Sequence, residues 1–297
     1  MFARALSVGL FGLLMCTLSN GQLLNPSFEN ADPDRATRWF TPPLHWHWQD
    51  TPSNLNYVGL HSQFTPNPEH RQPVNWTIPV PVEGTYFALL STGDAEGVGS
   101  SLKTQYSRME QRLTLCPGDA LSGYYFFGSC DYMPYDDTAT IMIVPSDPNE
   151  WPSDPNDWPR PVTLVKISTA DVGDYKSTDS WQHFYHRFKG SQCFTYTLVC
   201  EVRDELDKIF KSYLAVDHLR LCHNVPKYGD FNADCSIDYL DFEILAKTWL
   251  TDCSDPNVLA DPNIPCRQIM RDPNIIDGFV EIDHLTRLSD HWLERFD

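Results

Sequence analysis

Residues 107–127, SRMEQRLTLCPGDALSGYYFF, contain two strand-like runs separated by a turn signal. The runs are 107–115 and 120–127, and residues 111–115 alternate in part between polar and apolar side chains. Successive side chains of a strand point to opposite faces, so alternation places one face on a core and the other in solvent. This stretch therefore predicts half-buried β-strands.

Similar runs recur on both sides of this stretch. They cover residues 85–90, 139–144, 162–168, 181–188, 194–202 and 212–221. Many short strands with turn signals between them, and little helical period, are typical of an all-β sandwich. We expect a mainly β fold: a jelly-roll sandwich over residues 22–224, followed by a small α-helical module over residues 225–297.

The two ends of the predicted sandwich carry recognisable motifs. Residues 25–29 read NPSFE, and residues 212–221 read SYLAVDHLRL. Both resemble the first and last strands of galactose-binding-like jelly rolls, which include many carbohydrate-binding modules. The resemblance implies that these strands lie together and that Glu29 and Asp217 hold a structural calcium ion. The alternative is that each acid is a turn residue or a hydrogen-bond acceptor at a strand end.

The most specific motif is residues 230–241, which we call the acidic loop. Counted from Asp230 as position 1, oxygen-bearing side chains stand at positions 1, 3, 5, 9 and 12, and position 7 offers its backbone carbonyl. These residues are Asp230, Asn232, Asp234, Ser236, Asp238 and Asp241. A hard cation takes about six to eight oxygen ligands from a loop of this kind. The spacing therefore predicts a calcium site.

A helix with an apolar face is predicted directly after the acidic loop. Its apolar positions are Phe242, Leu245, Ala246, Trp249 and Leu250. A weaker copy follows 43 residues later, where Leu285, Leu288, Trp292 and Leu293 repeat the pattern and Asp277 and Glu281 repeat two of the acids. In this copy His284 stands at position 12, and Pro273 and Ile275 stand at positions 1 and 3. Asp283 would supply an oxygen only after a shift of one residue.

Two loop–helix units over residues 229–293 resemble a type I dockerin, a module that binds cohesin domains. The resemblance implies that Tyr239, Leu240 and Lys247 contact a cohesin-like protein. Cys235 departs from the pattern because glycine normally occupies this sharp turn. Since the two halves differ, we expect calcium in the first loop, a packing helix from residues 275–293, and a single docking orientation.

Aromatic and histidine residues suggest further sites. In residues 45–48, HWHW, the side chains of Trp46 and Trp48 either form a platform for a sugar ring or fill the core. The histidines invite a metal site with His61 or His70, but no spacing fixes a coordination sphere. Residues 145–161, PSDPNEWPSDPNDWPRP, hold too much proline for a sheet interior. In that loop, Trp151 and Trp158 either stack on sugars or cover the sandwich.

Net charge and cysteine content limit the partners and the cellular location that the chain can have. The net charge of −18 argues against nucleic acid and anionic membranes as partners. Residues 1–21, with Arg4 before an apolar run, predict a signal peptide, a secreted protein and no membrane span in the mature chain. Of nine cysteines, Cys16 lies in that segment, so eight remain, and disulfides are expected. Cys253 and Cys266 are the first predicted pair.

No motif for catalysis is present: the chain lacks a Gly-x-Ser-x-Gly elbow, a phosphate-binding glycine loop and a His-Glu-x-x-His helix. Missing motifs are weak evidence against an enzyme, because glycosidase carboxylates meet only in space. A sandwich of about 200 residues suits a binding module, so we expect a secreted, non-catalytic protein. Its sandwich would bind polysaccharide, and its calcium-dependent module would dock to another protein. Two alternatives stay open. One is a small polysaccharide lyase or hydrolase that bears a dockerin, and the other is a structural cell-surface protein whose tail packs on its own sandwich.

Overall fold

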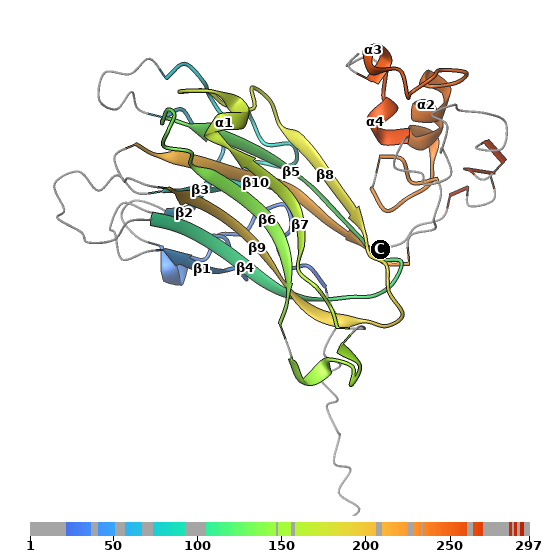
Figure 1. Cartoon of the computed structure of the whole chain (residues 1–297), viewed down its shortest axis with the longest axis horizontal. Coiled ribbons are helices and arrows are strands. Elements are labelled where there is room, and N and C mark those ends of the chain that lie inside the picture. The colour runs from blue at the N-terminus through green and yellow to red at the C-terminus, as the bar shows by residue number, and fades with distance from the viewer. Residues whose placement is uncertain are drawn as a thin grey trace, which may run out of the picture.

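The fold is described from a computed structural model. Its described residues are 22–36, 41–50, 57–66, 74–92, 105–146, 148–155, 158–205, 210–224, 229–232, 234–259, 264–269, 285–286, 288–289 and 292–293. Over this part of the chain, two five-stranded antiparallel sheets are stacked face to face, and a small helical module follows them (Figure 1). This confirms the prediction of a mainly β chain with a short helical C-terminal part.

The first sheet has the strand order β1-β4-β9-β6-β7, and every neighbouring pair is antiparallel. Its strands are β1 (His47–Asp50), β4 (Gln105–Leu115), β9 (Phe194–Asp204), β6 (Thr138–Pro145) and β7 (Val162–Ser168). Burial alternates along β6, where Ala139, Ile141 and Ile143 are buried and their neighbours are not. This is the pattern of a strand that covers a core with one face.

The second sheet has the order β2-β3-β10-β5-β8, again antiparallel throughout. Its strands are β2 (Tyr57–His61), β3 (Phe87–Ser91), β10 (Ser212–Cys222), β5 (Ala120–Ser129) and β8 (Gln182–Arg187). The last strand, β10, therefore lies in the centre of its sheet. The predicted strand runs from residue 85 onward all match strands of the two sheets to within a few residues, whereas β2 was not predicted.

The main core lies between the two sheets. Leu113, Ile141 and Leu198 contribute from the first sheet, and Leu90 and Leu214 from the second. Burying one such side chain stabilises the fold by about 1.5–3 kcal/mol. A second cluster covers the outer face of β3, β5 and β10 and includes Trp76, Ile78 and Tyr213. This double coverage explains why residues 213–216 of β10 form a continuous apolar run, since Leu214 and Val216 face the main core and Tyr213 and Ala215 face the second cluster.

The segment from Asn25 to Asn30 does not form the predicted opening strand. Asn25 and Phe28 have φ values of 50° and 57°, and Asn25 Oδ1 accepts a hydrogen bond from the Asn30 backbone N–H at 3.0 Å. Such local bonds offer the backbone an alternative to a β-ladder. The first and last segments of the sandwich still meet, because the Leu219 N–H donates to the Pro26 carbonyl at 3.1 Å.

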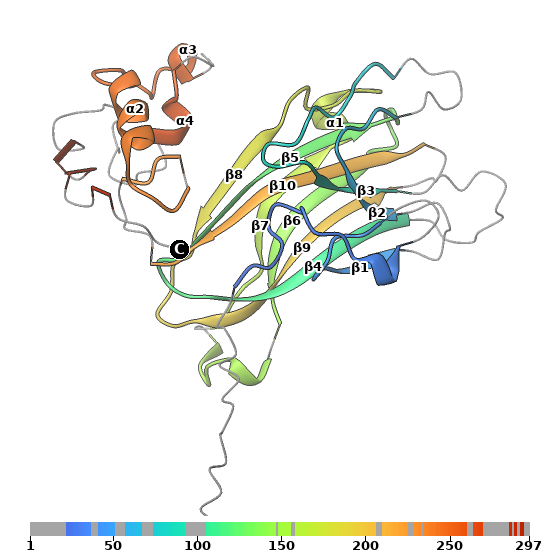
Figure 2. The ribbon, with the colours of Figure 1, turned by 180° about the vertical axis from the view of Figure 1, so that it is seen from behind.

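Short helices complete the fold. They are the 3₁₀ turns η1 (Pro33–Arg35) and η2 (Pro148–Glu150), and the α-helices α1 (Thr169–Val172), α2 (Tyr239–Lys247), α3 (Pro256–Leu259) and α4 (Cys266–Ile269). Figure 2 shows α2, α3 and α4 grouped beyond the end of β10. Within the described residues, no helix is long and apolar enough to cross a membrane.

The core of the helical module uses a different face of α2 from the predicted one. Ile244 and Leu245 are buried together with Ile237, Ile269 and Leu288. From the expected apolar stripe only Leu245 belongs to this core; its other members are exposed. The helical period was right, but the buried face is rotated toward Ile244.

Three disulfides connect the described residues: Cys116–Cys193, Cys222–Cys235 and Cys253–Cys266. The Cys253–Cys266 bond confirms the predicted pair. The three bonds confirm the expectation of disulfides, and Cys130 and Cys200 are buried.

Candidate functional site

The acidic loop brings three carboxylates together. One side-chain oxygen each from Asp230, Asp234 and Asp241 lies within 4.8 Å of the other two. Asp241 is fully buried at 0% exposure, and Asp230 is buried as well. Three acids this close repel one another unless a cation or protons offset their charge.

Backbone hydrogen bonds wind the loop around this cluster. The Asp234 N–H donates to Asp230 Oδ1 at 3.0 Å, and the Phe231 N–H donates to Asp241 Oδ1 at 2.6 Å. The Asp238 N–H donates to Asp241 Oδ2 at 2.9 Å. Asp238 also caps α2, because its Oδ1 accepts the Leu240 N–H at 2.8 Å. The loop and the helix start are therefore one hydrogen-bonded unit.

The electrostatics of Asp241 fit a cation. Burial and, to a smaller extent, the neighbouring Asp230 charge raise the pKa of Asp241 to about 7, against the backbone N–H groups that lower it. A divalent cation would remove this penalty by neutralising the buried carboxylate. All side-chain donors at the cluster are oxygens, which hard cations such as Ca²⁺ prefer. The residues present therefore fit a calcium ion.

The remaining predicted ligands lie beside the cluster. Asn232 Oδ1 accepts the Asp234 N–H at 3.0 Å, and the Ser236 N–H donates to Asp234 Oδ1 at 2.9 Å. The Asp238 side chain is engaged in the helix cap and is not part of the carboxylate cluster. Ligation of a calcium ion by Asn232, Ser236 and Asp238 stays a prediction.

Cys235 occupies the sharp turn of the acidic loop, where glycine is normally found. Its φ is 69°, the left-handed region that glycine normally supplies, and its sulfur is bonded to Cys222 at the end of β10. Arg220 of the same strand donates from Nη1 to the Asp234 carbonyl at 2.9 Å. The disulfide and the Arg220 hydrogen bond thus connect the acidic loop to β10 at Cys235, the residue with the positive φ.

The second predicted loop cannot be compared in the same way. Asp277, Glu281 and Asp283 lie outside the described residues. The apolar residues after them behave as a packing element, because Leu288 is buried in the module core and Leu285 and Trp292 pack against it.

Glu29 and Asp217 both hold the segment 82–86. Glu29 Oε1 accepts the Thr85 and Tyr86 N–H groups at 2.8 and 2.9 Å, and Asp217 Oδ2 accepts the Val82 N–H at 2.7 Å. Burial raises the pKa of Asp217 to about 6 although backbone N–H groups bind it. This is the hydrogen-bond acceptor role left open by the sequence. A calcium ion at these two residues stays a prediction.

The HWHW segment does not form a sugar platform. Trp46 is 2% exposed, packs on Phe28 with ring centroids 5.4 Å apart, and donates from Nε1 to the Asn25 carbonyl at 3.4 Å. Trp48 is partly buried against the same core. Core filling is therefore the role of Trp46, and Trp48 packs against the same core while it stays partly exposed. His47 lies in the first sheet and His61 in the second, and His70 is outside the described residues.

Trp151 and Trp158 are paired in the proline-rich insertion. Their ring centroids are 5.1 Å apart, and Trp158 Nε1 donates to the Pro152 carbonyl at 2.9 Å. Trp158 is 43% exposed. It lines a cavity of about 490 Å³ at one end of the sandwich.

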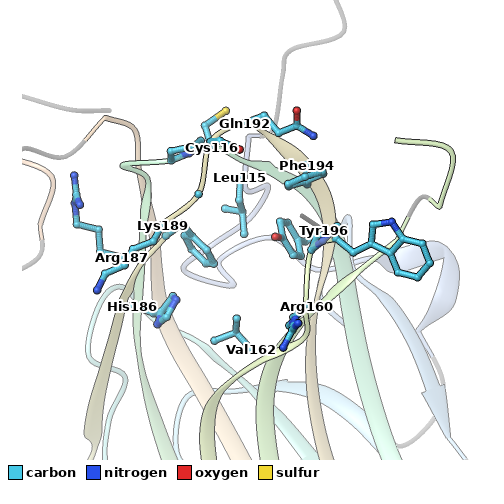
Figure 3. Close-up of a pocket in the computed structure, with 16 residues that line it drawn as sticks. Leu115, Cys116, Arg160, Val162, His186, Arg187, Lys189, Gln192, Phe194 and Tyr196 are labelled. Atoms are coloured by element: carbon cyan, nitrogen blue, oxygen red, sulfur yellow. The ribbon is translucent and has the colours of Figure 1, made fainter. Parts of the chain in front are cut away.

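The cavity was not foreseen from the sequence (Figure 3). Its lining combines aromatic and cationic side chains from distant parts of the chain. They are Trp158, Arg160, His186, Arg187, Phe188, Lys189, Phe194 and Tyr196. No local motif announces such a site, since its residues meet only after β7, β8 and β9 are in place. Trp158, in the proline-rich insertion, was the one residue of this lining that the sequence analysis singled out.

A second hollow lies on the helical module. Phe242, Ala246 and Trp249 of the exposed stripe line a groove of about 330 Å³ together with Leu245 and Leu285. Next to it, Tyr239 and Leu240 are 75% and 53% exposed. Lys247 Nζ lies 2.6 Å from Glu243 Oε1 on the surface of α2. The predicted partner-contacting residues are therefore all at the surface.

No protein-family model matches this chain, and no curated protein matches it. Among solved structures, the chain is similar to a family 61 carbohydrate-binding module in complex with β-1,4-galactotriose. The identity is 14%, the match covers 68% of this chain and 98% of that chain, and the TM-score is 0.35.

The chain is also similar to the K1 cleaved adhesin domain of Lys-gingipain from Porphyromonas gingivalis (12% identity, 66% and 94% coverage, TM-score 0.34). A third similar structure is the C-terminal family 22 carbohydrate-binding module of Clostridium thermocellum Xyn10B. There the identity is 13%, the coverage 64% of this chain and 93% of that chain, and the TM-score 0.27. Similarities of this size assign no family and no ligand, so the fold rests on the two sheets themselves.

Proposed function

We propose that this is an exported, non-catalytic protein with two functional parts. A jelly-roll sandwich over residues 22–224 binds carbohydrate, and a calcium-stabilised module over residues 225–297 docks the sandwich to another protein. Three disulfides support an oxidising, extracellular location, where such bonds persist. The observation that carries the proposal is the buried carboxylate cluster at the start of α2.

In this proposal the acidic loop holds one Ca²⁺. The side chains of Asp230, Asn232, Asp234 and Asp241 and the backbone carbonyl of Ser236 supply oxygens, and Asp238 acts through a water molecule, as position 9 often does. The ion supplies positive charge at a buried acid. The chain itself uses Asp241 to join the ion to the first turn of α2, so ion binding and helix position are coupled.

Docking would use the exposed face of α2. Tyr239 and Leu240 protrude, and the groove lined by Phe242 and Trp249 lies beside them. Exposed aromatic and aliphatic side chains next to a hollow are typical of protein-binding sites. The resemblance to type I dockerins indicates a cohesin-like domain as the partner. The exposure of Tyr239 and Leu240 gives no support to a tail that covers this surface with its own sandwich.

Titration of the chain from residue 22 onward with CaCl₂, followed by calorimetry and thermal unfolding, tests the calcium site. We expect binding of at least one ion and a higher melting temperature, and Asp230→Asn should weaken both. The matched control is Asp252→Asn, an exposed acid whose side chain accepts hydrogen bonds from Ser254 and is not part of the cluster. Absence of binding at millimolar calcium would overturn the site.

Carbohydrate binding by the sandwich is supported by Trp158, a tryptophan that is 43% exposed beside a cavity of about 490 Å³. Exposed aromatic rings offer flat apolar faces, and polar groups around them fix orientation. Binding to a panel of plant and bacterial polysaccharides, with Trp158→Ala as the variant, tests this part. Absence of binding to every polysaccharide in the panel would overturn carbohydrate binding by the sandwich. It would leave the proposed calcium site unaffected.

A further inference from the structure

Arg220 connects the sandwich to the acidic loop through a backbone carbonyl. Its Nη1 donates to the Asp234 carbonyl at 2.9 Å. Arg220 stands two residues before Cys222 in the regular end of β10, so both side chains point to the same face of the strand. The hydrogen bond to Asp234 and the disulfide to Cys235 therefore reach consecutive residues of the loop from one strand.

The sandwich holds the Arg220 guanidinium in place. Its Nε donates to His218 Nε2 at 2.8 Å, and its Nη2 lies 3.9 Å from Glu83 Oε1. Glu83 is itself held, because its Oε2 accepts the Ser27 hydroxyl at 2.7 Å and lies 2.8 Å from His218 Nδ1. Burial and the Arg220 charge lower the pKa of His218, against the Glu83 carboxylate that raises it, so Nε2 is an acceptor near pH 7. A guanidinium fixed in this way presents Nη1 to the loop in one direction.

The carbonyl that Arg220 holds belongs to the peptide unit between Asp234 and Cys235. A trans peptide is planar, so its C=O and its N–H point in opposite directions. The Cys235 N–H donates to Asp230 Oδ2 at 3.3 Å, on the side of the carboxylate cluster. The carbonyl therefore points away from the cluster and toward Arg220. Arg220 and Asp230 fix one orientation of this peptide unit from its two sides.

The backbone of Cys235 by itself favours the opposite orientation. Its φ is 69°, in the left-handed region that residues with a Cβ adopt at a cost in free energy. Turning the peptide unit over would change this angle by about 180° and bring it into the ordinary extended region. It would also turn the N–H away from the Asp230 carboxylate. Glycine would tolerate both orientations, whereas cysteine needs a contact from outside the loop that selects one.

We infer that Arg220 is a positioning residue of the acidic loop, which selects the orientation of the Asp234–Cys235 peptide unit that the loop needs to hold a cation. The inference rests on the proposed calcium site and gives the sandwich a part in it. Arg220 acts on the ion only through the loop backbone. By linkage, an ion that prefers this orientation also strengthens the contact between Arg220 and Asp234.

Calorimetry with the chain from residue 22 onward tests the effect on calcium affinity. Arg220→Gln should weaken calcium binding about tenfold, the loss expected for one hydrogen bond to a charged group. Arg220→Lys keeps a cationic donor and should lose less. Circular dichroism of each variant checks that it is folded. An unchanged calcium affinity in Arg220→Gln would overturn the inference.

The matched control is Arg203→Gln, which should leave calcium affinity unchanged. Arg203 is 38% exposed and Arg220 is 34% exposed, and the Nη2 of Arg203 lies 2.7 Å from Glu201 Oε1. Arg203 is on β9, in the other sheet. An equal loss of calcium affinity in Arg203→Gln and Arg220→Gln would show a general effect of lost charge and would overturn the inference.

A glycine background separates peptide orientation from general support of the module. In Cys222→Ser/Cys235→Gly, residue 235 has no Cβ and no preference for a negative φ. Arg220→Gln should then weaken calcium binding only about twofold relative to this background, because about half of the loops keep the competent orientation. A tenfold loss in both backgrounds would overturn the role in orientation, since the effect would not depend on the residue at position 235.

Hydrogen exchange of the Cys235 amide in the ion-free chain gives a readout that does not depend on calcium. NMR of protein labelled with ¹⁵N-cysteine would measure it. We expect slow exchange in the unaltered chain and in Arg203→Gln, and faster exchange in Arg220→Gln. Unchanged exchange in Arg220→Gln would overturn the inference. If the unaltered chain binds no calcium, the proposed calcium site is overturned, and the exchange result alone decides whether Arg220 orients the loop.

Discussion

Cys235, in the turn of the acidic loop, is disulfide-bonded to Cys222, the last residue of β10. The bond spans 13 residues and joins the proposed calcium site to the central strand of one sheet. Because the Cys235 backbone also has a positive φ, the bond supports a conformation that most residues adopt reluctantly. The Cys222–Cys235 bond therefore couples the geometry of the acidic loop to the sandwich.

Removing this bond should destabilise the module. For the double variant Cys222→Ser/Cys235→Ser we expect a loss of about 2–4 kcal/mol in unfolding free energy, the usual range for a disulfide. Calcium affinity should fall as well, because the loop becomes free to open. Denaturant unfolding and calcium titration measure the two effects. Cys116→Ser/Cys193→Ser serves as the control, since it removes a bond of the sandwich alone. An unchanged calcium affinity in the first variant would refute the coupling.

Calcium binding should depend on pH through Asp241. Its pKa is about 7 in the folded chain without an ion, above the ordinary aspartate value, so the folded state holds a proton that the unfolded state has lost. The ion-free chain should therefore lose stability as pH rises from about 4 to about 7, and calcium affinity should rise over the same range.

Calorimetry in buffers of different ionisation enthalpy would measure the proton released by calcium binding. Asp241→Asn should abolish both the proton release and the ion binding. A calcium affinity that stays constant between pH 5 and pH 8 would contradict the role of Asp241.

The two faces of α2 should respond differently to truncation. Leu245→Ala removes a buried side chain of the module core and should cost about 2–5 kcal/mol. Leu240→Ala alters an exposed residue and should change stability by less than about 0.5 kcal/mol. Only Leu240→Ala should then reduce binding to a cohesin-like domain without lowering the melting temperature. Equal loss of stability in both variants would show that Leu240 is a packing residue.

Two tryptophans provide a similar contrast in the sandwich. Trp46→Ala should cost about 3–5 kcal/mol because the ring fills the core against Phe28. Trp158→Ala should cost far less, since its ring is partly in solvent. Urea unfolding followed by circular dichroism would measure both. A stable Trp46→Ala variant would indicate that the ring is dispensable for packing.

The sequence predicted the parts of the fold that depend on local patterns. Alternation in β4 and the apolar run of β10 placed strands correctly, because period 2 is read directly from neighbouring residues. The spacing of Asp230, Asp234 and Asp241 likewise anticipated their meeting, since a tight loop fixes the geometry of its own side chains.

The predictions that failed are those that depend on which other elements pack against a residue. Trp46 and Trp158 read alike as tryptophans near proline or histidine, yet one is in the core and the other in solvent. The stripe on α2 had the right period, but of its members only Leu245 faces the module core, together with Ile244. The cavity joins residues from the strands β4, β7, β8 and β9, so no window of sequence contains it.

The position of Cys222 has a mechanical consequence. A partner that pulls on the helical module would load the Cys222–Cys235 disulfide, because this bond links the module directly to the end of β10. The load would enter at Cys222, where β10 is paired with β5, whereas its pairing with β3 covers only Tyr213–Val216. Tension along β10 would therefore shear the ladder with β5 before it reaches the ladder with β3.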